Sequence, residues 1–196
     1  MPKKFVFIDR DGVINKDGGS SARGYITRWK DFIFLPKALA ALKKLAGKGY
    51  SAVIISNQQG VGKGIYTERE LKKITEKMKQ RIEKKGGRVA GIYYCTHRKE
   101  ENCACRKPKI GLIVKAKKRL RIGSFKGKFI IGDAERDVET GKRAGLRSIL
   151  VLTGNSTRKD AANWKCKPDH ICKDLMEAVN IVLADEQERP IRKTQK

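Results

Sequence analysis

The sequence predicts an α/β fold: a single doubly wound, Rossmann-like domain in which helices cover both faces of a parallel sheet. Short apolar, β-branched segments alternate along the chain with longer segments whose apolar residues recur at helical spacing. No internal repeat or low-complexity linker divides the 196 residues, a length that suits one good-sized core. Strands that alternate with helices are typical of βαβ units, whose sheet is parallel and buried on both sides.

The expected strands are the short apolar runs. They are Phe5–Ile8, Ala52–Ile55, Val89–Tyr94, Phe129–Ile131 and Ser148–Leu152. In a sheet of this kind, ligands bind at the carboxyl ends of the strands, where the strand order reverses.

The expected helices lie between and after these strands. They are Pro36–Ala46, Glu68–Lys84, Leu112–Leu120, Arg136–Ala144 and Leu175–Ala184. Thr67 and Glu70 have the spacing of a capping box at the start of the second helix. The domain is expected to span residues 1–185, with a polar tail at residues 186–196.

A net charge of +25, from 46 Lys and Arg against 21 Asp and Glu, is the strongest compositional feature of the chain. It favours an anionic partner, and nucleic acid, anionic lipid and phosphorylated metabolites all qualify. The basic residues are spread over the whole sequence without a run of about five or six like charges, so a general compositional bias explains the charge equally well.

The chain has no apolar run near the roughly 18 residues of a membrane span. Its first residues run directly into a strand pattern, without a cleavable signal segment. We therefore expect a cytoplasmic protein, with a monomer as the default state.

Polar side chains follow three of the expected strands directly. Asp9 and Asp11 follow the first strand, the Ser56–Gln58 segment follows the second, and Asp133 and Asp137 follow the fourth. A single Asp at a strand end most often caps a helix. Three such ends in a parallel sheet converge on one edge, where a few carboxylates suit Mg²⁺ with water and phosphate oxygens as its other ligands.

Three cysteines and a histidine lie close together in the pattern Cys95-x-His97-x5-Cys103-x-Cys105. Three thiolates and one imidazole suit tetrahedral Zn²⁺, and a shell filled by protein ligands is structural rather than catalytic. The alternative is that the four residues fall together by coincidence. The odd total of five cysteines argues against a disulfide framework.

Two further cysteines lie outside this pattern. Cys166 and Cys172 flank His170, and the three residues are either a second metal site or partly buried bystanders. We favour bystanders because the sequence offers no fourth ligand nearby. The Gly60–Gly64 stretch lacks the spacing of a P-loop and is expected to be a flexible turn near the substrate.

Four motifs occur in order along the chain: Asp9-Arg-Asp11-Gly-Val-Ile-Asn15, Ser56-Asn-Gln, Cys105-Arg-Lys107-Pro and Gly132-Asp133-Ala-Glu-Arg-Asp137. They resemble those of the haloacid dehalogenase (HAD) superfamily, and most closely its capless branch of heptose-bisphosphate and histidinol-phosphate phosphatases. The resemblance covers roughly residues 4–183.

The resemblance implies a chemical role for each of the first acids. Asp9 would attack phosphorus and form an aspartyl-phosphate. Asp11 would protonate the leaving oxygen and later activate water, which requires a pKa tuned to the working pH. Residues i and i+2 of an extended strand face the same way, so both carboxylates would lie on one side.

The remaining roles are also implied by the resemblance. Ser56 would hydrogen-bond the phosphoryl oxygens, and Lys107 would neutralise the phosphoryl group during transfer. The expected Mg²⁺ ligands are Asp9, Asp11 and Asp133, with Asp137 in support. The expected zinc ligands are Cys95, His97, Cys103 and Cys105. The expected substrate-binding residues are Gly24, Tyr25, Asn57, Gln58 and Arg106.

The resemblance therefore implies a Mg²⁺-dependent phosphatase of a small phosphorylated metabolite, foremost D-glycero-D-manno-heptose 1,7-bisphosphate. Histidinol phosphate is the alternative substrate within the same chemistry. The Asn15–Tyr25 segment is longer and richer in Gly and Ser than the corresponding family loop, which leaves the leaving group open. The charge allows a phosphatase of nucleic-acid 3′ ends, although no aromatic residues interleave with the basic ones to stack bases. A zinc-stabilised binding module without catalysis is the alternative from another class.

Overall fold

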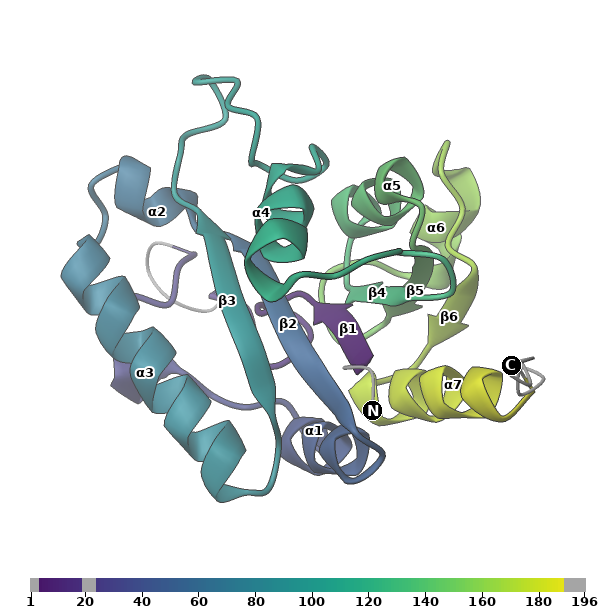
Figure 1. The fold of residues 1–196 in the computed structure, drawn as a ribbon. Coiled ribbons are helices and arrows are strands. Elements are labelled where there is room, and N and C mark those ends of the chain that lie inside the picture. The colour runs from purple at the N-terminus through teal and green to yellow at the C-terminus, as the bar shows by residue number, and fades with distance from the viewer. Residues whose placement is uncertain (1–3, 19–23, 189–196) are drawn as a thin grey trace.

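Six parallel strands form one sheet in the computed structural model, which describes residues 4–18 and 24–188 (Figure 1). The strand order is β3-β2-β1-β4-β5-β6. The strands are β1 (Lys4–Ile8), β2 (Tyr50–Asn57), β3 (Val89–Cys95), β4 (Phe129–Gly132), β5 (Arg147–Val151) and β6 (His170–Cys172). Each neighbouring pair is parallel, which confirms the doubly wound α/β prediction.

The order of the strands reverses at β1. The chain builds β2 and β3 on one side of β1, then crosses to place β4 on the other side. A cleft forms outside the carboxyl ends of the strands at such a reversal, because the two connections leave in opposite directions. The Asp9–Asp11 segment follows β1 at this point.

Helices cover both faces of the sheet. One face carries α1 (Ala38–Gly47), α3 (Glu68–Lys84) and α7 (Leu175–Glu188), and the other carries α4 (Gly111–Leu120) and α5 (Glu135–Ala144). The alternation of side chains in β1 explains this arrangement, because Val6 and Ile8 pack into the first core and Phe5 and Phe7 into the second.

The predicted helices and strands are present, with ends that differ from the prediction by at most four residues. The capping box is confirmed: the Thr67 hydroxyl accepts a hydrogen bond from the Glu70 backbone, and the Glu70 carboxylate accepts one from the Thr67 backbone. Helix α7 runs to Glu188, past the expected boundary at residue 185. Residues 189–196 of the expected tail and residues 19–23 of the Gly/Ser-rich segment lie outside the described residues.

Four short elements were not predicted: η1 (Trp29–Asp31), α2 (Gln59–Gly62), α6 (Arg158–Asn163) and β6. The Gly60–Gly64 stretch is therefore partly helical, which corrects the expected turn. Helix α6 begins with a second capping box, between Thr157 and Asp160, that the sequence displays.

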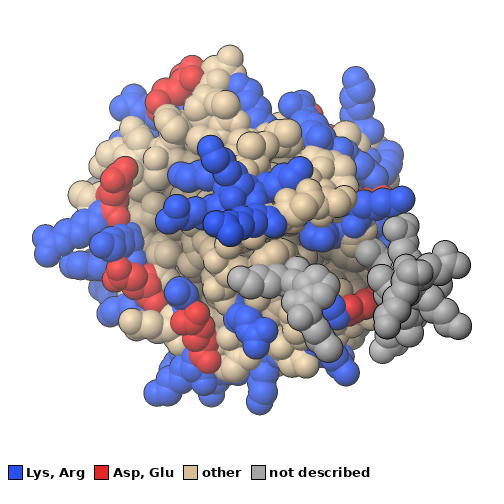
Figure 2. Space-filling model, in the orientation of Figure 1, with Lys and Arg blue, Asp and Glu red and all other residues tan. Residues whose placement is uncertain are grey.

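Basic side chains cover much of the surface and gather over α4, whereas acidic and basic side chains alternate along α3 (Figure 2). The exposed cations of α4 are Lys115, Lys117, Lys118 and Arg119. Among the described residues, no helix has both the length and the apolar character that a membrane crossing demands.

Candidate active site

A cleft of about 190 Å³ opens where β1 and β2 end. Eight of the residues predicted from the sequence line it: Asp9, Asp11, Gly24, Tyr25, Ser56, Asn57, Gln58 and Arg106. The sheet therefore brings together motifs that are far apart in the sequence, as the parallel arrangement predicted.

Lys107 connects two buried carboxylates at this cleft. Its Nζ atom lies 2.9 Å from Oδ2 of Asp9 and 2.5 Å from Oδ1 of Asp137, and it also donates to the Ile55 carbonyl at 3.1 Å. Burial opposes the charge on Lys107, but attraction to Asp137 and Asp9 outweighs burial and raises its pKa. For Asp9, burial prevails over the attraction of Lys107 and raises the pKa.

Asn57 fixes the backbone of Lys107. The Asn57 amide donates to the Lys107 carbonyl at 3.1 Å, and the Lys107 N–H donates to the Asn57 amide oxygen at 3.0 Å. This reciprocal pair ties the end of β2 to the segment after the cysteine cluster. Asn57 thus positions a cation in addition to lining the cleft.

Three residues donate four hydrogen bonds to the Asp11 carboxylate. Arg10 binds one oxygen through Nε at 3.0 Å and Nη2 at 2.8 Å, Asn15 donates at 2.9 Å, and Gln58 donates to the other oxygen at 2.7 Å. Burial opposes the charge on Asp11, but attraction to Arg10 and these hydrogen bonds outweigh it and lower the pKa of Asp11. In this arrangement Asp11 is a carboxylate.

Gln58 links Asp11 to a buried tyrosine and to Ser56. Its amide also donates to the Ser56 hydroxyl at 3.0 Å, and the Tyr66 hydroxyl donates to its carbonyl oxygen at 2.6 Å. Because Tyr66 fixes the orientation of the amide, Gln58 presents its N–H groups to Asp11 and Ser56.

Asp9, Asp133 and Asp137 form a cluster whose carboxylate oxygens lie within 4.8 Å of one another, and all three are buried. Burial, with repulsion from Asp137 and Asp9, raises the pKa of Asp133 to about 7. Among the described residues, Oδ1 of Asp133 has no hydrogen-bond partner. Three buried carboxylates with one such oxygen fit a divalent cation, which would offset their repulsion.

Asp11 does not belong to this acidic cluster. Its carboxylate faces Arg10, Asn15 and Gln58 instead. The cluster supports the predicted magnesium ligands Asp9 and Asp133, while a role for the Asp11 side chain as a ligand stays a prediction.

Two glycines leave room for the Asp133 carboxylate. A Cβ atom added at Gly154 would lie 1.9 Å from Oδ2 of Asp133, and one added at Gly12, whose φ is +77°, would lie 2.3 Å from the same oxygen. The Thr153 hydroxyl donates to the Gly12 carbonyl at 2.6 Å and holds the two loops together. Asp133 therefore fits closely between two backbone segments.

The cysteine cluster has the dimensions of a tetrahedral zinc site. The Sγ atom of Cys103 lies 3.5 Å from that of Cys95 and 3.6 Å from that of Cys105, and Nδ1 of His97 lies 3.7 Å and 3.3 Å from the Sγ atoms of Cys95 and Cys105. A tetrahedron with Zn–S bonds of about 2.3 Å has edges of about 3.8 Å. The four ligand atoms thus fit zinc, as the spacing predicted.

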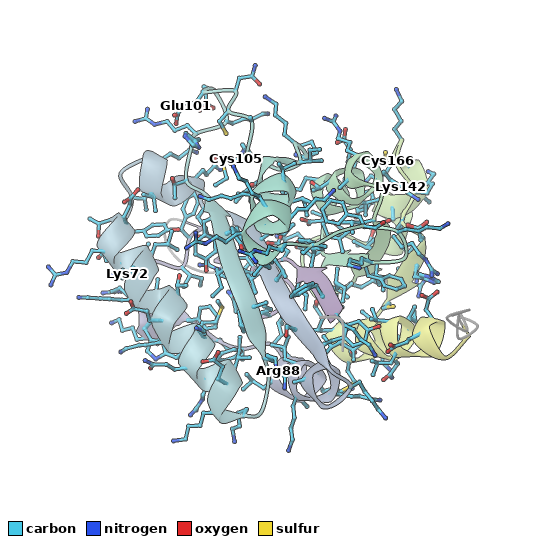
Figure 3. The ribbon with its side chains drawn as sticks, viewed as in Figure 1. Lys72, Arg88, Glu101, Cys105, Lys142 and Cys166 are labelled. Carbon is cyan, nitrogen blue, oxygen red and sulfur yellow. The ribbon has the colours of Figure 1, made fainter. Side chains whose placement is uncertain are left out.

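The other cysteines lie elsewhere. Figure 3 shows Cys166 near α6, apart from the loop that carries Cys105. Cys172 is buried in the core beside α7, and a ring nitrogen of His170 lies 3.0 Å from Nη2 of Arg147. Within the described parts of the chain, the groups that fit a metal do not include these residues.

The structure adds cleft residues that the sequence did not single out: Arg10, Asp17, Gln59 and Arg136. Nη2 of Arg136 lies 3.7 Å from Oδ1 of Asp133, and Gln59 donates to the Tyr25 hydroxyl at 3.1 Å. Arg10 is buried although it is charged, and its position between two motif acids is the signal that could have pointed to it.

Comparisons with known proteins identify the family. Residues 104–178 match the HAD-hydrolase-like family model. The chain is 39% identical over 165 residues to D-glycero-beta-D-manno-heptose-1,7-bisphosphate 7-phosphatase of Helicobacter pylori, covering 84% of this chain and 91% of the relative. The chain belongs to the HAD-like phosphatase family.

Two further relatives of this family are informative. The chain is also 34% identical to D-glycero-alpha-D-manno-heptose-1,7-bisphosphate 7-phosphatase of Photorhabdus laumondii, whose name specifies the alpha anomer. The match covers 82% of this chain and 88% of the relative. The crystal structure of D,D-heptose 1,7-bisphosphate phosphatase from B. bronchiseptica, complexed with magnesium and phosphate, superposes with a TM-score of 0.84 at 32% identity. It covers 93% of this chain and 99% of that one.

Proposed function

We propose that this protein is a Mg²⁺-dependent phosphatase that removes the 7-phosphate of D-glycero-D-manno-heptose 1,7-bisphosphate. The observation that carries the proposal is the buried ion pair of Asp9 and Lys107, in which Asp9 lines a cleft that is also lined by Arg106 and Arg136. Relatives that match most of the chain bear the name of this activity. Consumption of a charged metabolite suits a cytoplasmic enzyme.

Asp9 is the nucleophile in this proposal. One carboxylate oxygen accepts a hydrogen bond from the Arg10 backbone at 2.7 Å, and the other faces Lys107. The side chain is therefore fixed before substrate arrives. An Asp9 oxygen forms a bond to phosphorus as the bond from phosphorus to the leaving oxygen breaks, giving an aspartyl-phosphate.

Asp11 is the general acid and general base in this proposal. The lowered pKa of Asp11 suits the second half of the reaction, in which a carboxylate takes a proton from the water that attacks the aspartyl-phosphate. The first half requires a protonated Asp11. An incoming phosphoryl dianion repels the carboxylate and raises the pKa of Asp11 in the complex, so substrate binding itself favours proton uptake.

The surrounding groups stabilise the phosphoryl charge. Lys107 supplies a buried cation, and the Ser56 hydroxyl, oriented by Gln58, supplies a hydrogen bond. Arg106 lines the cleft and its planar guanidinium suits the second phosphate of a bisphosphate. Mg²⁺, held by Asp9 and Asp133, would lower the repulsion between the nucleophile and an anionic substrate.

The zinc cluster would serve the same site indirectly. Cys105, its last ligand, precedes Arg106 and Lys107 directly. A bound zinc ion would fix the loop that carries both cations, since the loop contributes few side chains to the core.

Phosphate release from a substrate panel tests the proposal. Both anomers of heptose 1,7-bisphosphate, histidinol phosphate and a 3′-phosphorylated oligonucleotide are assayed with and without added Mg²⁺, on protein that retains its zinc. We expect the heptose bisphosphates to give the highest kcat/KM, and the Asp9→Asn variant to be inactive on every substrate. A preference for histidinol phosphate or the oligonucleotide would overturn the substrate assignment, and undiminished turnover by the variant would overturn the mechanism.

A further inference from the structure

A second groove, of about 330 Å³, lies between η1 and α3. Trp29 lines it from one side, and Lys77, Gln80, Arg81 and Lys84 line it from α3. It shares no lining residue with the active-site cleft. Its size lies at the lower end of the range of about 300–1,000 Å³ for small-molecule sites.

The α3 side of this groove is a row of cations. Lys77, Arg81 and Lys84 follow the i, i+4, i+7 spacing of a single helix face. The acids beside them on α3 are engaged elsewhere, because Glu76 pairs with Lys72 and Glu83 with Lys79. Within residues 4–18 and 24–188, the three cations of the row have no ion-pair partner.

The other side of the groove is an anchored indole. The Trp29 ring stacks on Phe32 with centroids 5.1 Å apart and meets the edge of Phe34 at 6.4 Å. Phe32 is buried in the core, so the position of Trp29 is set before any ligand binds. Trp29 itself is only half-buried.

A fixed aromatic ring opposite a row of cations is the arrangement that binds a base and its phosphate together, through stacking and charge. We propose that the groove between η1 and α3 binds a nucleotide, either free or as a unit of a single-stranded nucleic acid. Duplex DNA is a poorer fit because its base faces are covered by neighbouring bases. The sequence did not display this pairing, since Trp29 and the α3 cations lie in separate segments that only the fold brings together.

An anionic membrane surface is the competing partner for any basic region of this chain. It would be attracted to charge alone, without need of a groove or an indole. The exposed cations of α4 provide that charge, and the apolar face of α4 is buried against the sheet. The combination of cavity and aromatic ring at α3 therefore favours the nucleotide.

Fluorescence of Trp29 tests the proposal directly. The chain has two tryptophans, so Trp164→Phe leaves Trp29 as the only tryptophan in the protein. We expect saturable quenching by AMP or by an oligonucleotide without terminal phosphates. Tighter binding of AMP identifies the ligand as a free nucleotide, and tighter binding of the oligonucleotide identifies it as a single-stranded nucleic acid. Inorganic phosphate is expected to give no quenching. Absence of quenching by both nucleotide probes, or quenching by anionic lipid vesicles alone, overturns the proposal.

Paired charge variants separate the groove from the overall charge. Lys77→Gln with Lys84→Gln removes two cations from the row, while Lys72→Gln with Lys79→Gln removes two from the opposite side of the same helix. For the oligonucleotide, we expect the first pair to reduce the slope of log affinity against log salt concentration by about 1.4, at about 0.7 for each contact to a single strand. The second pair should leave the slope nearly unchanged, and an equal loss in both pairs assigns binding to net charge and overturns the groove.

Removal of the ring tests stacking. For whichever of AMP and the oligonucleotide binds more tightly, we expect Trp29→Ala to weaken binding roughly 5- to 150-fold, the range that one base–aromatic stack contributes. Affinity is followed by anisotropy of a labelled ligand, because this variant lacks the fluorescent reporter. Circular dichroism confirms that the variant is folded, and Trp29→Phe, which keeps an aromatic ring on Phe32, should recover most of the affinity. A folded Trp29→Ala protein that binds as tightly as the parent overturns the proposal.

Discussion

The ammonium group of Lys107 lies 2.9 Å from the carboxylate of Asp9, with both side chains almost completely buried. Removal from water costs each of these groups several kcal/mol, which only a close partner offsets. The ion pair therefore holds the proposed nucleophile, Asp9, next to the cation that would stabilise the negative charge of the phosphoryl group. Asp137, at 2.5 Å from the same ammonium, completes the set.

Lys107→Gln is expected to impair both catalysis and folding. Loss of the cation should lower kcat by about 10²- to 10³-fold, the effect typical of a preorganised group that stabilises transition-state charge. It also leaves Asp9 and Asp137 buried without their partner, which should lower the free energy of unfolding by about 3–5 kcal/mol. Phosphate release and urea denaturation measure the two effects.

The matched control is Lys109→Gln. Lys109 belongs to the same segment, but its ammonium binds Asn102 on the surface. It should change kcat little. Equal activity in the two variants would remove Lys107 from the proposed mechanism.

Because the pKa of Asp133 is raised, we expect its contribution to the free energy of unfolding of the magnesium-free protein to decrease as the pH rises. Its pKa is raised from 3.8 to about 7 in the folded state. A raised folded-state pKa means that the folded protein binds the proton more tightly than the unfolded chain does. The resulting stability is present in full below about pH 4 and is lost as the pH rises to about 7, by up to about 4 kcal/mol from this group.

Magnesium should reverse that loss. A divalent cation competes with the proton for the acidic cluster, so we expect Mg²⁺ to raise the melting temperature more at pH 8 than at pH 5. Thermal denaturation at the two pH values, with zinc retained throughout, measures this difference. Asp133→Asn should abolish most of it, and a stabilisation by Mg²⁺ that is independent of pH would contradict the assignment of Asp133 as a ligand.

Gly154→Ala should weaken magnesium binding without a change in any charge. The added methyl group would lie 1.9 Å from Oδ2 of Asp133, so the carboxylate must move. Displacement of a metal ligand through a neighbouring residue typically reduces metal affinity roughly 10- to 100-fold. The Mg²⁺ concentration that gives half-maximal activity measures the effect.

Gly47→Ala serves as the reference substitution, because nothing lies within 4 Å of a Cβ atom at Gly47. It should leave the Mg²⁺ requirement unchanged. If both alanine variants need the same Mg²⁺ concentration as the parent, the close fit around Asp133 has no part in metal binding.

The sequence predicted the parallel sheet and the convergence at its edge because both follow from patterns within single segments. Asp9 and Asp133 each stand directly after a buried strand, and parallel strands place their carboxyl ends together. β6 escaped prediction because three residues, His170–Cys172, carry too little apolar pattern to indicate a strand.

Contacts between segments that are distant in the chain could not be predicted from the sequence. The Asn57–Lys107 hydrogen bonds and the approach of Gly154 to Asp133 depend on how loops pack, and neither leaves a mark on local spacing. The lowered pKa of Asp11 comes chiefly from the adjacent Arg10, and only the hydrogen bond from Gln58, which follows β2, depends on the packing of a distant segment. Motifs thus identified most of the candidate residues, while their mutual positions came from tertiary packing.

Zinc is expected to act on catalysis through the position of Lys107. The Ala104 carbonyl, within the cysteine cluster, accepts a hydrogen bond from the Gly111 backbone at the start of α4, so the loop is fixed at both ends when its four ligands meet. Cys103→Ser removes a central ligand. We expect lower zinc content and lower kcat together, because a disordered loop no longer holds Lys107 against Asp9.

Zinc analysis, phosphate release and limited proteolysis of the loop measure these effects in one preparation. Cys166→Ser, which changes a cysteine outside the cluster, should retain zinc, activity and resistance to cleavage. The decisive comparison is between zinc content and activity in partially depleted samples. We expect activity to fall in proportion to zinc content, because the two cations follow Cys105 directly in the chain. A zinc-free protein with an intact loop and full turnover would show that the metal has no influence on the phosphate-binding cations.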